Sequence, residues 1–119
     1  MSTGPEELRD RTKRFAVRIV KVYKSLPFAA DAQVLGKQLL RSGTSIAANY
    51  RASCRARSRA EWVAKIGLVV EEADESVFWL EMLMDCGIVP ERKLKDLLDE
   101  ARELSALFTA SQRTARMTG

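Results

Sequence analysis

Four apolar seams at helical spacing, separated by proline and glycine, constrain the fold of this chain more than any other feature. The first seam consists of Phe15, Ile19, Val22 and Leu26, and Pro27 directly after it cannot continue a helix. The three later seams repeat with the same period of three or four residues. Because one amphipathic helix cannot bury its own seam, these stretches must pack on one another.

The second and third stretches carry their own start and stop signals. The second begins after Asp31, a residue type that often precedes a helix. It contains Gly43, which costs a helix about 1 kcal/mol relative to alanine, so we expect a neighbouring helix to approach closely there. The third begins at Ser58, where Glu61 three residues later completes a capping box. Gly87 is a suitable C-terminal breaker.

The fourth stretch follows Pro90, and the last residues of the chain are expected to fray. The predicted helices span about residues 5–26, 31–55, 58–86 and 90–114. Helices of this length with short connections predict an all-α fold, specifically an antiparallel up-down four-helix bundle. At 119 residues the chain is expected to form a single domain over 1–119.

The composition argues against several kinds of catalytic site. The chain has no histidine, which removes Ser-His-Asp and Cys-His catalysis and the Glu-x-x-His ligands of di-iron bundles. It also lacks the glycine motifs that bind phosphates. Cys54 and Cys86 have no metal-ligand spacing, so we expect reduced thiols that are buried or inert. We therefore expect no enzyme, no catalytic residue, no metal site and no cofactor.

One catalytic alternative stays open, in which carboxylates of two adjacent helices hold Mg²⁺ over a triphosphate. The all-α nucleotide pyrophosphohydrolases of the MazG type use ExxE followed by ExxD for this purpose. This chain has the first half and only DxxD or ExxE for the second. The residues concerned are Glu71, Glu72, Glu75, Asp96, Asp99, Glu100 and Glu103. Acidic clusters on helices are more often solvated or ion-paired.

Charge is strongly segregated along the chain, although the net charge is only +4. Residues 41–60 carry five arginines and no acid, whereas residues 61–85 carry seven acids and one lysine. On a helical wheel, most of the basic side chains of the second stretch lie opposite its apolar seam. They are expected to attract phosphates or an acidic partner, or else to face the acidic block within the chain or across a subunit contact. The candidate nucleic-acid-binding residues are Lys37, Arg41, Arg51, Arg55 and Arg59.

The third stretch has a second line of residues on the side away from its seam. A helix that packs on one side only should be polar there, and Trp and Met are enriched at subunit interfaces. We therefore expect an oligomer interface made of Leu68, Glu72, Glu75, Trp79 and Met82.

Residues 40–83 closely resemble the four helix bundle protein family, also called the 23S rRNA-intervening-sequence proteins. The resemblance rests on Arg41, Ser42, Ser45, Ile46, Ala48, Asn49 and the "FWLE" stretch at 78–81, and it extends over about residues 8–115. It implies a small bacterial four-helix bundle that assembles into a homopentamer, and it brings no catalytic residues with it. The similar accessory variability proteins of diversity-generating retroelements are basic pentameric barrels that bind nucleic acid and a reverse transcriptase.

Together these features predict a non-enzymatic, homo-oligomeric assembly or adaptor protein without an assigned molecular role. Its expected partners are further copies of itself, RNA or DNA bound without sequence specificity, and a protein partner. No apolar run approaches the roughly 20 residues of a membrane span, and the first residues lack the apolar stretch of a signal peptide. We therefore expect a cytoplasmic protein with no membrane contact.

Overall fold

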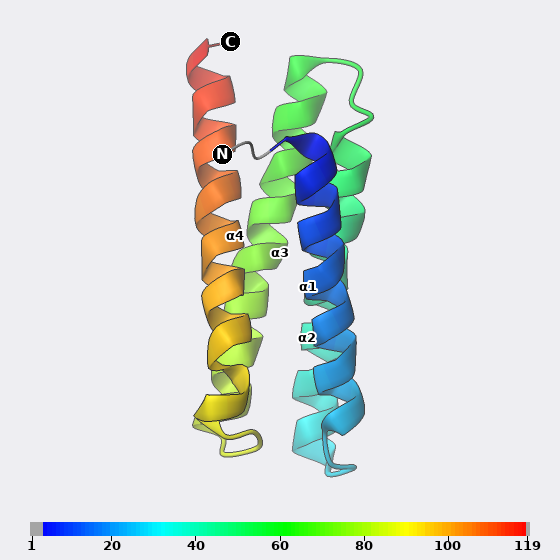
Figure 1. Cartoon of the computed structure of the whole chain (residues 1–119), viewed down its shortest axis with the longest axis vertical. Helices are drawn as coiled ribbons and strands as arrows, with labels where there is room; N and C mark the ends of the chain where they lie inside the picture. The colour runs from blue at the N-terminus through cyan, green and yellow to red at the C-terminus, as the bar shows by residue number, and fades with distance from the viewer. Residues whose placement is uncertain (1–3, 119) are drawn as a thin grey trace.

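The computed structural model describes residues 4–118 as four helices in an antiparallel bundle (Figure 1). The helices are α1 (Pro5–Ser25), α2 (Ala30–Ser53), α3 (Arg59–Asp85) and α4 (Glu91–Thr118). The bundle measures 47 × 25 × 22 Å. Each helix packs on its neighbour in sequence, whereas α1 and α4 touch at few points. The predicted all-α four-helix bundle is confirmed.

Two helix ends differ from the predicted ones by more than one residue. Helix α2 stops at Ser53, two residues early, because the N–H groups of Arg55 and Ala56 turn back to carbonyls three residues before them. Arg55 therefore lies in the connection between α2 and α3 and not on the helix. Helix α4 continues to Thr118, so the fraying expected after residue 114 is wrong for the described part of the chain.

The capping signals are confirmed at α3 but not at α2. The Ser58 hydroxyl accepts a hydrogen bond from the Glu61 N–H at 3.0 Å, and Gly87 ends the helix with φ of 71°. At α2 the capping position is held by Ala29, without a side-chain hydrogen bond. Asp31 lies inside the first turn, where its carboxylate accepts a hydrogen bond from the N–H of Ala32 at 2.9 Å. Its negative charge also interacts favourably with the positive end of the helix dipole.

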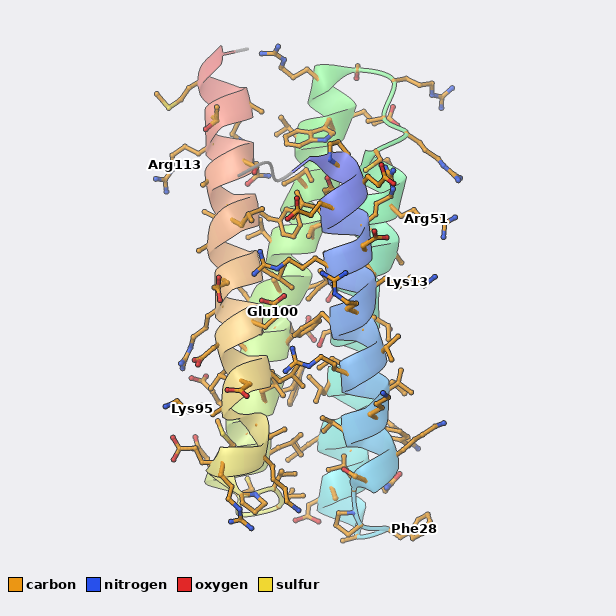
Figure 2. The ribbon with its side chains drawn as sticks, viewed as in Figure 1. Lys13, Phe28, Arg51, Lys95, Glu100 and Arg113 are labelled. Atoms are coloured by element: carbon orange, nitrogen blue, oxygen red, sulfur yellow. The ribbon has the colours of Figure 1, made fainter. Side chains whose placement is uncertain are left out.

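A bidentate ion pair connects α1 to α4, the pair of adjacent helices with the least packing between them. Arg11 donates to both carboxylate oxygens of Glu100, with N–O distances of 2.7 and 2.8 Å. Glu100 points toward α1 in Figure 2. Both side chains are largely shielded from water, so the geometry is that of a strong charge-assisted pair. The pairing also raises the pKa of Arg11.

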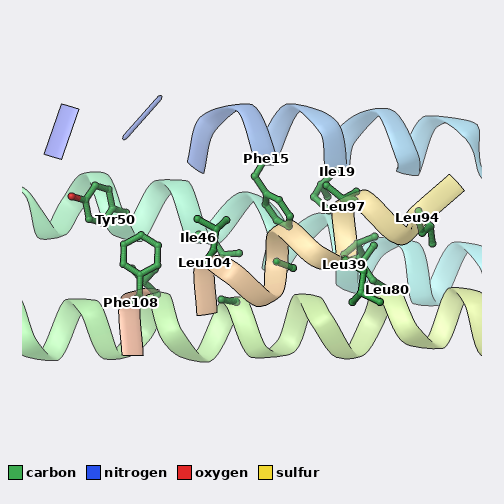
Figure 3. Packing of buried hydrophobic residues seen from close by; sticks show 14 of the residues in the cluster. Phe15, Ile19, Leu39, Ile46, Tyr50, Leu80, Leu94, Leu97, Leu104 and Phe108 are labelled. Atoms are coloured by element: carbon green, nitrogen blue, oxygen red, sulfur yellow. The ribbon is translucent and has the colours of Figure 1, made fainter. Parts of the chain in front are cut away.

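The apolar seams meet along the axis of the bundle, as their spacing predicted (Figure 3). At one end the rings of Tyr50 and Phe108 pack at 5.1 Å between centroids. The largest fully buried side chains include Phe15, Ile19, Leu39, Ile46, Ile66, Leu80, Leu94, Leu104 and Phe108.

Small residues on α2 bring both of its neighbours close. A β-carbon on Gly43 would lie 2.7 Å from Ile19 Cγ1 on α1, which confirms the expected close approach at this glycine. The adjacent Ser42 faces the other way and accepts a buried hydrogen bond from the Ser76 hydroxyl on α3 at 2.9 Å. Helix α2 is therefore packed tightly on both sides at the same level.

We predict that Gly43→Ala destabilises the protein, while Gly67→Ala does not. At Gly43 the gain of about 1 kcal/mol in helix propensity is outweighed by overpacking against Ile19, which typically costs ~1–3 kcal/mol. At Gly67 the new β-carbon meets only the flexible amide end of Gln112. Displacing this amide weakens its hydrogen bond to the Val63 carbonyl, a cost of about 1 kcal/mol that the gain in helix propensity offsets. Urea denaturation of both variants measures the difference. Equal stability of the two would show that the α1–α2 contact is not tight.

Candidate nucleic-acid interface

Of the two candidate arginines on α2, Arg41 has carboxylate partners among the described residues and Arg51 has none. Arg41 reaches across to α3, where it donates to Glu72 at 3.1 Å and to Glu75. The basic and acidic blocks therefore meet within one chain at this point. Because Arg41 is already neutralised and stays 47% exposed, it is a weak candidate for binding phosphate.

Lys37 is exposed on α2 one turn before Arg41, and the other three candidates lie toward the opposite end of the bundle. Arg51 is exposed near the opposite end, Arg55 is exposed in the connection to α3, and Arg59 is the first residue of α3. The five candidate residues thus do not form one continuous stripe.

Three arginines form what we name the basic end: Arg51, Arg55 and Arg57, all exposed where α2 passes into α3. Within residues 4–118, no carboxylate oxygen lies within 4 Å of any of them. Their charges therefore face solvent without local compensation.

A second group of cations on α1 was missed in the sequence analysis. Five exposed basic side chains follow one side of this helix, around the 46% exposed Val17, and none has a carboxylate partner among the described residues. The sequence signal was present, because residues 11–30 contain no acid at all. We name the group the α1 basic face: Lys13, Arg14, Arg18, Lys21 and Lys24.

The two basic groups adjoin each other. Lys13 of the α1 basic face and Arg51 of the basic end line the same crevice between α1 and α2, and both point to the same side of the molecule in Figure 2. Asp10 is an acidic residue that also lines this crevice. The resulting positive surface covers the outer side of α1 and one end of α2.

The residues of the expected oligomer interface keep only part of their apolar surface free. Glu72 and Glu75 pair with Arg41, and Glu75 also accepts the indole N–H of Trp79 at 3.1 Å. Trp79 and Met82 are half-buried, whereas Leu68 is 48% exposed. Phe78, which the prediction did not include, is 50% exposed and packs edge-on against Trp79 at 4.8 Å.

The carboxylates of the pyrophosphohydrolase alternative point to different neighbours. Glu72 and Glu75 face Arg41 of α2, whereas Glu100 and Glu103 face Arg11 of α1. Among residues 4–118, no group of three or more acidic or cysteine side chains has the arrangement of a metal site. Cys54 and Cys86 are both exposed and unpaired, so their expected burial is wrong.

The surroundings of Tyr50 at the basic end change the acidity of its hydroxyl. Its side chain is 5% exposed, and burial, together with its interaction with the Cys54 thiol, raises its pKa to about 12. The guanidinium of Arg9 nearby acts in the opposite direction, because a positive charge favours the phenolate. The Tyr50 hydroxyl therefore stays protonated at neutral pH and can donate a hydrogen bond.

Comparison with known proteins assigns the family. The model for 23S rRNA-intervening sequence protein matches residues 7–110. The chain belongs to this family. Its fold matches the crystal structure of a protein of unknown function from the S23 ribosomal protein family of Bacteroides thetaiotaomicron, with a TM-score of 0.84 and 34% identity. That match covers 92% of this chain and 97% of the other.

The match confirms the resemblance recognised from residues 40–83. No curated protein matches the chain, and neither the family model nor the solved structure names an activity. Within residues 4–118, no helix of this 23S rRNA-intervening sequence protein has the length and hydropathy needed to cross a membrane.

We predict that Tyr50 titrates near pH 12 and that its burial adds to the loss of stability at high pH. The unfolded chain loses the phenolic proton near pH 10, whereas the folded chain keeps it to about 12. The free energy of unfolding should therefore fall between these two pH values, and the Tyr50→Phe variant should lack this part of the fall. Absorbance of tyrosinate and urea denaturation, each compared between wild type and variant, measure the two effects. A difference spectrum that titrates at pH 10 would contradict the prediction.

Proposed function

We propose that this 23S rRNA-intervening sequence protein binds the sugar–phosphate backbone of nucleic acid without sequence specificity. The observation that carries the proposal is the set of exposed cations without carboxylate partners on the α1 basic face and the basic end. Unpaired Lys and Arg release counterions when they contact phosphates, which is the main source of non-specific affinity. Phosphate contacts of this kind position a protein on nucleic acid but do not select a sequence.

The residues proposed to bind nucleic acid are not the same as those predicted from the sequence. Arg41 contributes little, because Glu72 and Glu75 already neutralise it. The α1 basic face takes its place and runs along much of the helix. The family name, 23S rRNA-intervening sequence protein, and the S23 ribosomal protein family of the solved relative are in keeping with RNA as the polyanion.

We predict that Arg14→Gln/Lys21→Gln weakens RNA binding, while Lys93→Gln/Lys95→Gln does not. Both double variants lose two positive charges, but Lys93 and Lys95 are exposed at the start of α4, and Lys95 points away from α1 in Figure 2. Each phosphate contact removed should lower the slope of log K against log salt by about 1. Fluorescence anisotropy with a labelled RNA at several salt concentrations measures this slope. Equal losses in both variants would mean that net charge alone governs binding.

We further propose that the protein self-associates through the outer side of α3. Leu68 and Phe78 are about half exposed there, and Trp79 lies against Phe78. Large apolar side chains aligned on one exposed helix face are typical of subunit contacts. The acidic groups around them, Glu71 and Asp74, favour a positive surface on the neighbouring copy. A homo-oligomer of this kind is also what the family resemblance implies, with five subunits.

We predict that Leu68→Ser/Phe78→Ser reduces the mass of the particle in solution. Both side chains are exposed in the single chain, so the double variant should keep its helical content and unfold at a similar urea concentration. Val17→Ser/Val34→Ser is the matched control, because those valines are also exposed but lie on α1 and α2. Light scattering after size exclusion gives the mass. An unchanged mass in the α3 variant would assign the subunit contact, if there is one, to another face.

A further inference from the structure

A crevice of about 400 Å³ lies at the basic end, where α1 and α3 begin and α2 and α4 end. We name it the end crevice. It is lined by aromatic and aliphatic side chains together with polar ones. The residues that matter for its chemistry are Leu8, Arg9, Tyr50, Cys54, Trp62 and Phe108. Crevices of about 300–1,000 Å³ with mostly apolar walls and a few converging polar groups are typical binding sites for small ring systems.

Arg9 also belongs to the crevice between α1 and α2, which we name the α1–α2 groove. This groove measures about 450 Å³ and contains Lys13 and Arg51. Two of its lining residues, Ala47 and Ala48, have side chains too short to block the approach of a backbone. A crevice with aromatic side chains and a groove with cationic side chains therefore meet at one arginine.

We infer that the end crevice holds the terminal unpaired base of a single-stranded nucleic acid and that the α1–α2 groove carries the phosphates that follow it. Arg9 at the junction contacts the first phosphate, and Lys13 and Arg51 contact the next ones. The inference rests on the proposed nucleic-acid binding and names the form of nucleic acid that this surface takes.

The lining of the end crevice fits a base better than it fits a bare phosphate. Trp62 is partly exposed and offers an aromatic surface for stacking, while Leu8 and Phe108, which belong to the buried core, line the crevice with little exposed surface. The Tyr50 hydroxyl, which interacts with the Cys54 thiol, adds a polar group to the lining. Stacking and backbone contacts of this kind tolerate any sequence, in agreement with the absence of base-specific recognition in the proposal.

The same geometry selects against a blunt duplex. A base that enters the end crevice must leave its stack, and a terminal unpaired nucleotide does so at little cost. A paired terminal base would first have to break its pair. One stacked base contributes a preference on the order of ten- to a hundredfold, so single strands should bind more tightly than blunt duplexes of the same length.

The test uses the full chain and two RNA probes of equal length, a single strand and a blunt duplex, each with a fluorescent base analogue (2-aminopurine) at one end. We expect the single strand to bind at least about tenfold more tightly and its terminal analogue to be quenched by Trp62. An analogue placed in the middle of the strand should be quenched much less.

Two variants separate the crevice from the general basic surface. Ala56→Phe fills the end crevice, which Ala56 lines, and should abolish both the terminal quenching and the preference for the single strand. Arg9→Gln should weaken single-strand binding more than Arg92→Gln, which removes the same charge at the start of α4. Ser111→Leu fills the crevice from α4 and replaces Ala56→Phe should that variant unfold at a lower urea concentration.

The outcomes distinguish this inference from the proposal on which it rests. Equal, salt-dependent binding of both probes, unchanged by the crevice-filling variants, would overturn the end crevice as a base site and leave backbone binding intact. Failure of both probes to bind at low salt would overturn both. Binding of the single strand without terminal quenching would show that the base lies outside the crevice and would also overturn the inference.

Discussion

The close packing of α2 against both α1 and α3 is the contact on which the arrangement of this bundle depends. Gly43 admits Ile19 of α1, and the adjacent Ser42 takes a hydrogen bond from Ser76 of α3. Because α1 makes few contacts with α4, its position is set mainly by α2, with Arg11 pairing on the other side with Glu100 and Glu103 of α4. A larger side chain in the middle of α2 would move α1 outward, and the groove that unites the cations of the two helices would change with it.

The fold was largely predictable because its signals are local. Seam spacing, prolines and the cap at Ser58 depend on neighbours within a few positions, and they gave the four helices and the antiparallel topology. The two helix ends that were predicted wrongly, those of α2 and α4, depend on features other than the local sequence pattern. Gln112 donates to the carbonyl of Val63 on α3 at 3.0 Å, so the last turns of α4 are held by a partner that helical periodicity does not reveal. Cys54 likewise ends α2 in a tight turn without a glycine or proline to announce it.

The candidate interface was less predictable, and for a different reason. A helical wheel gives the outward side of α2, but it does not say which residues of α3 lie opposite. The pairing of Arg41 with Glu72 and Glu75 follows from the relative register of two packed helices, which one sequence does not contain. The α1 basic face, in contrast, was within reach of sequence reasoning, since 20 consecutive residues without an acid are visible before any folding is considered.

The opposed charges of α1 and α3 cannot neutralise each other within one chain. Helix α1 carries seven basic and three acidic side chains, and α3 carries two basic and seven acidic ones, but the two helices make no direct packing contact in the described bundle. Their outward faces are separated by more than the screening length of about 8 Å at physiological salt, so each acts on its own surroundings. A polyanion drawn to α1 is repelled at α3. The charge pattern thus favours binding of a polyanion on the side of α1. It leaves the acidic, partly apolar face of α3 available for a positively charged surface, including one on another copy of the chain.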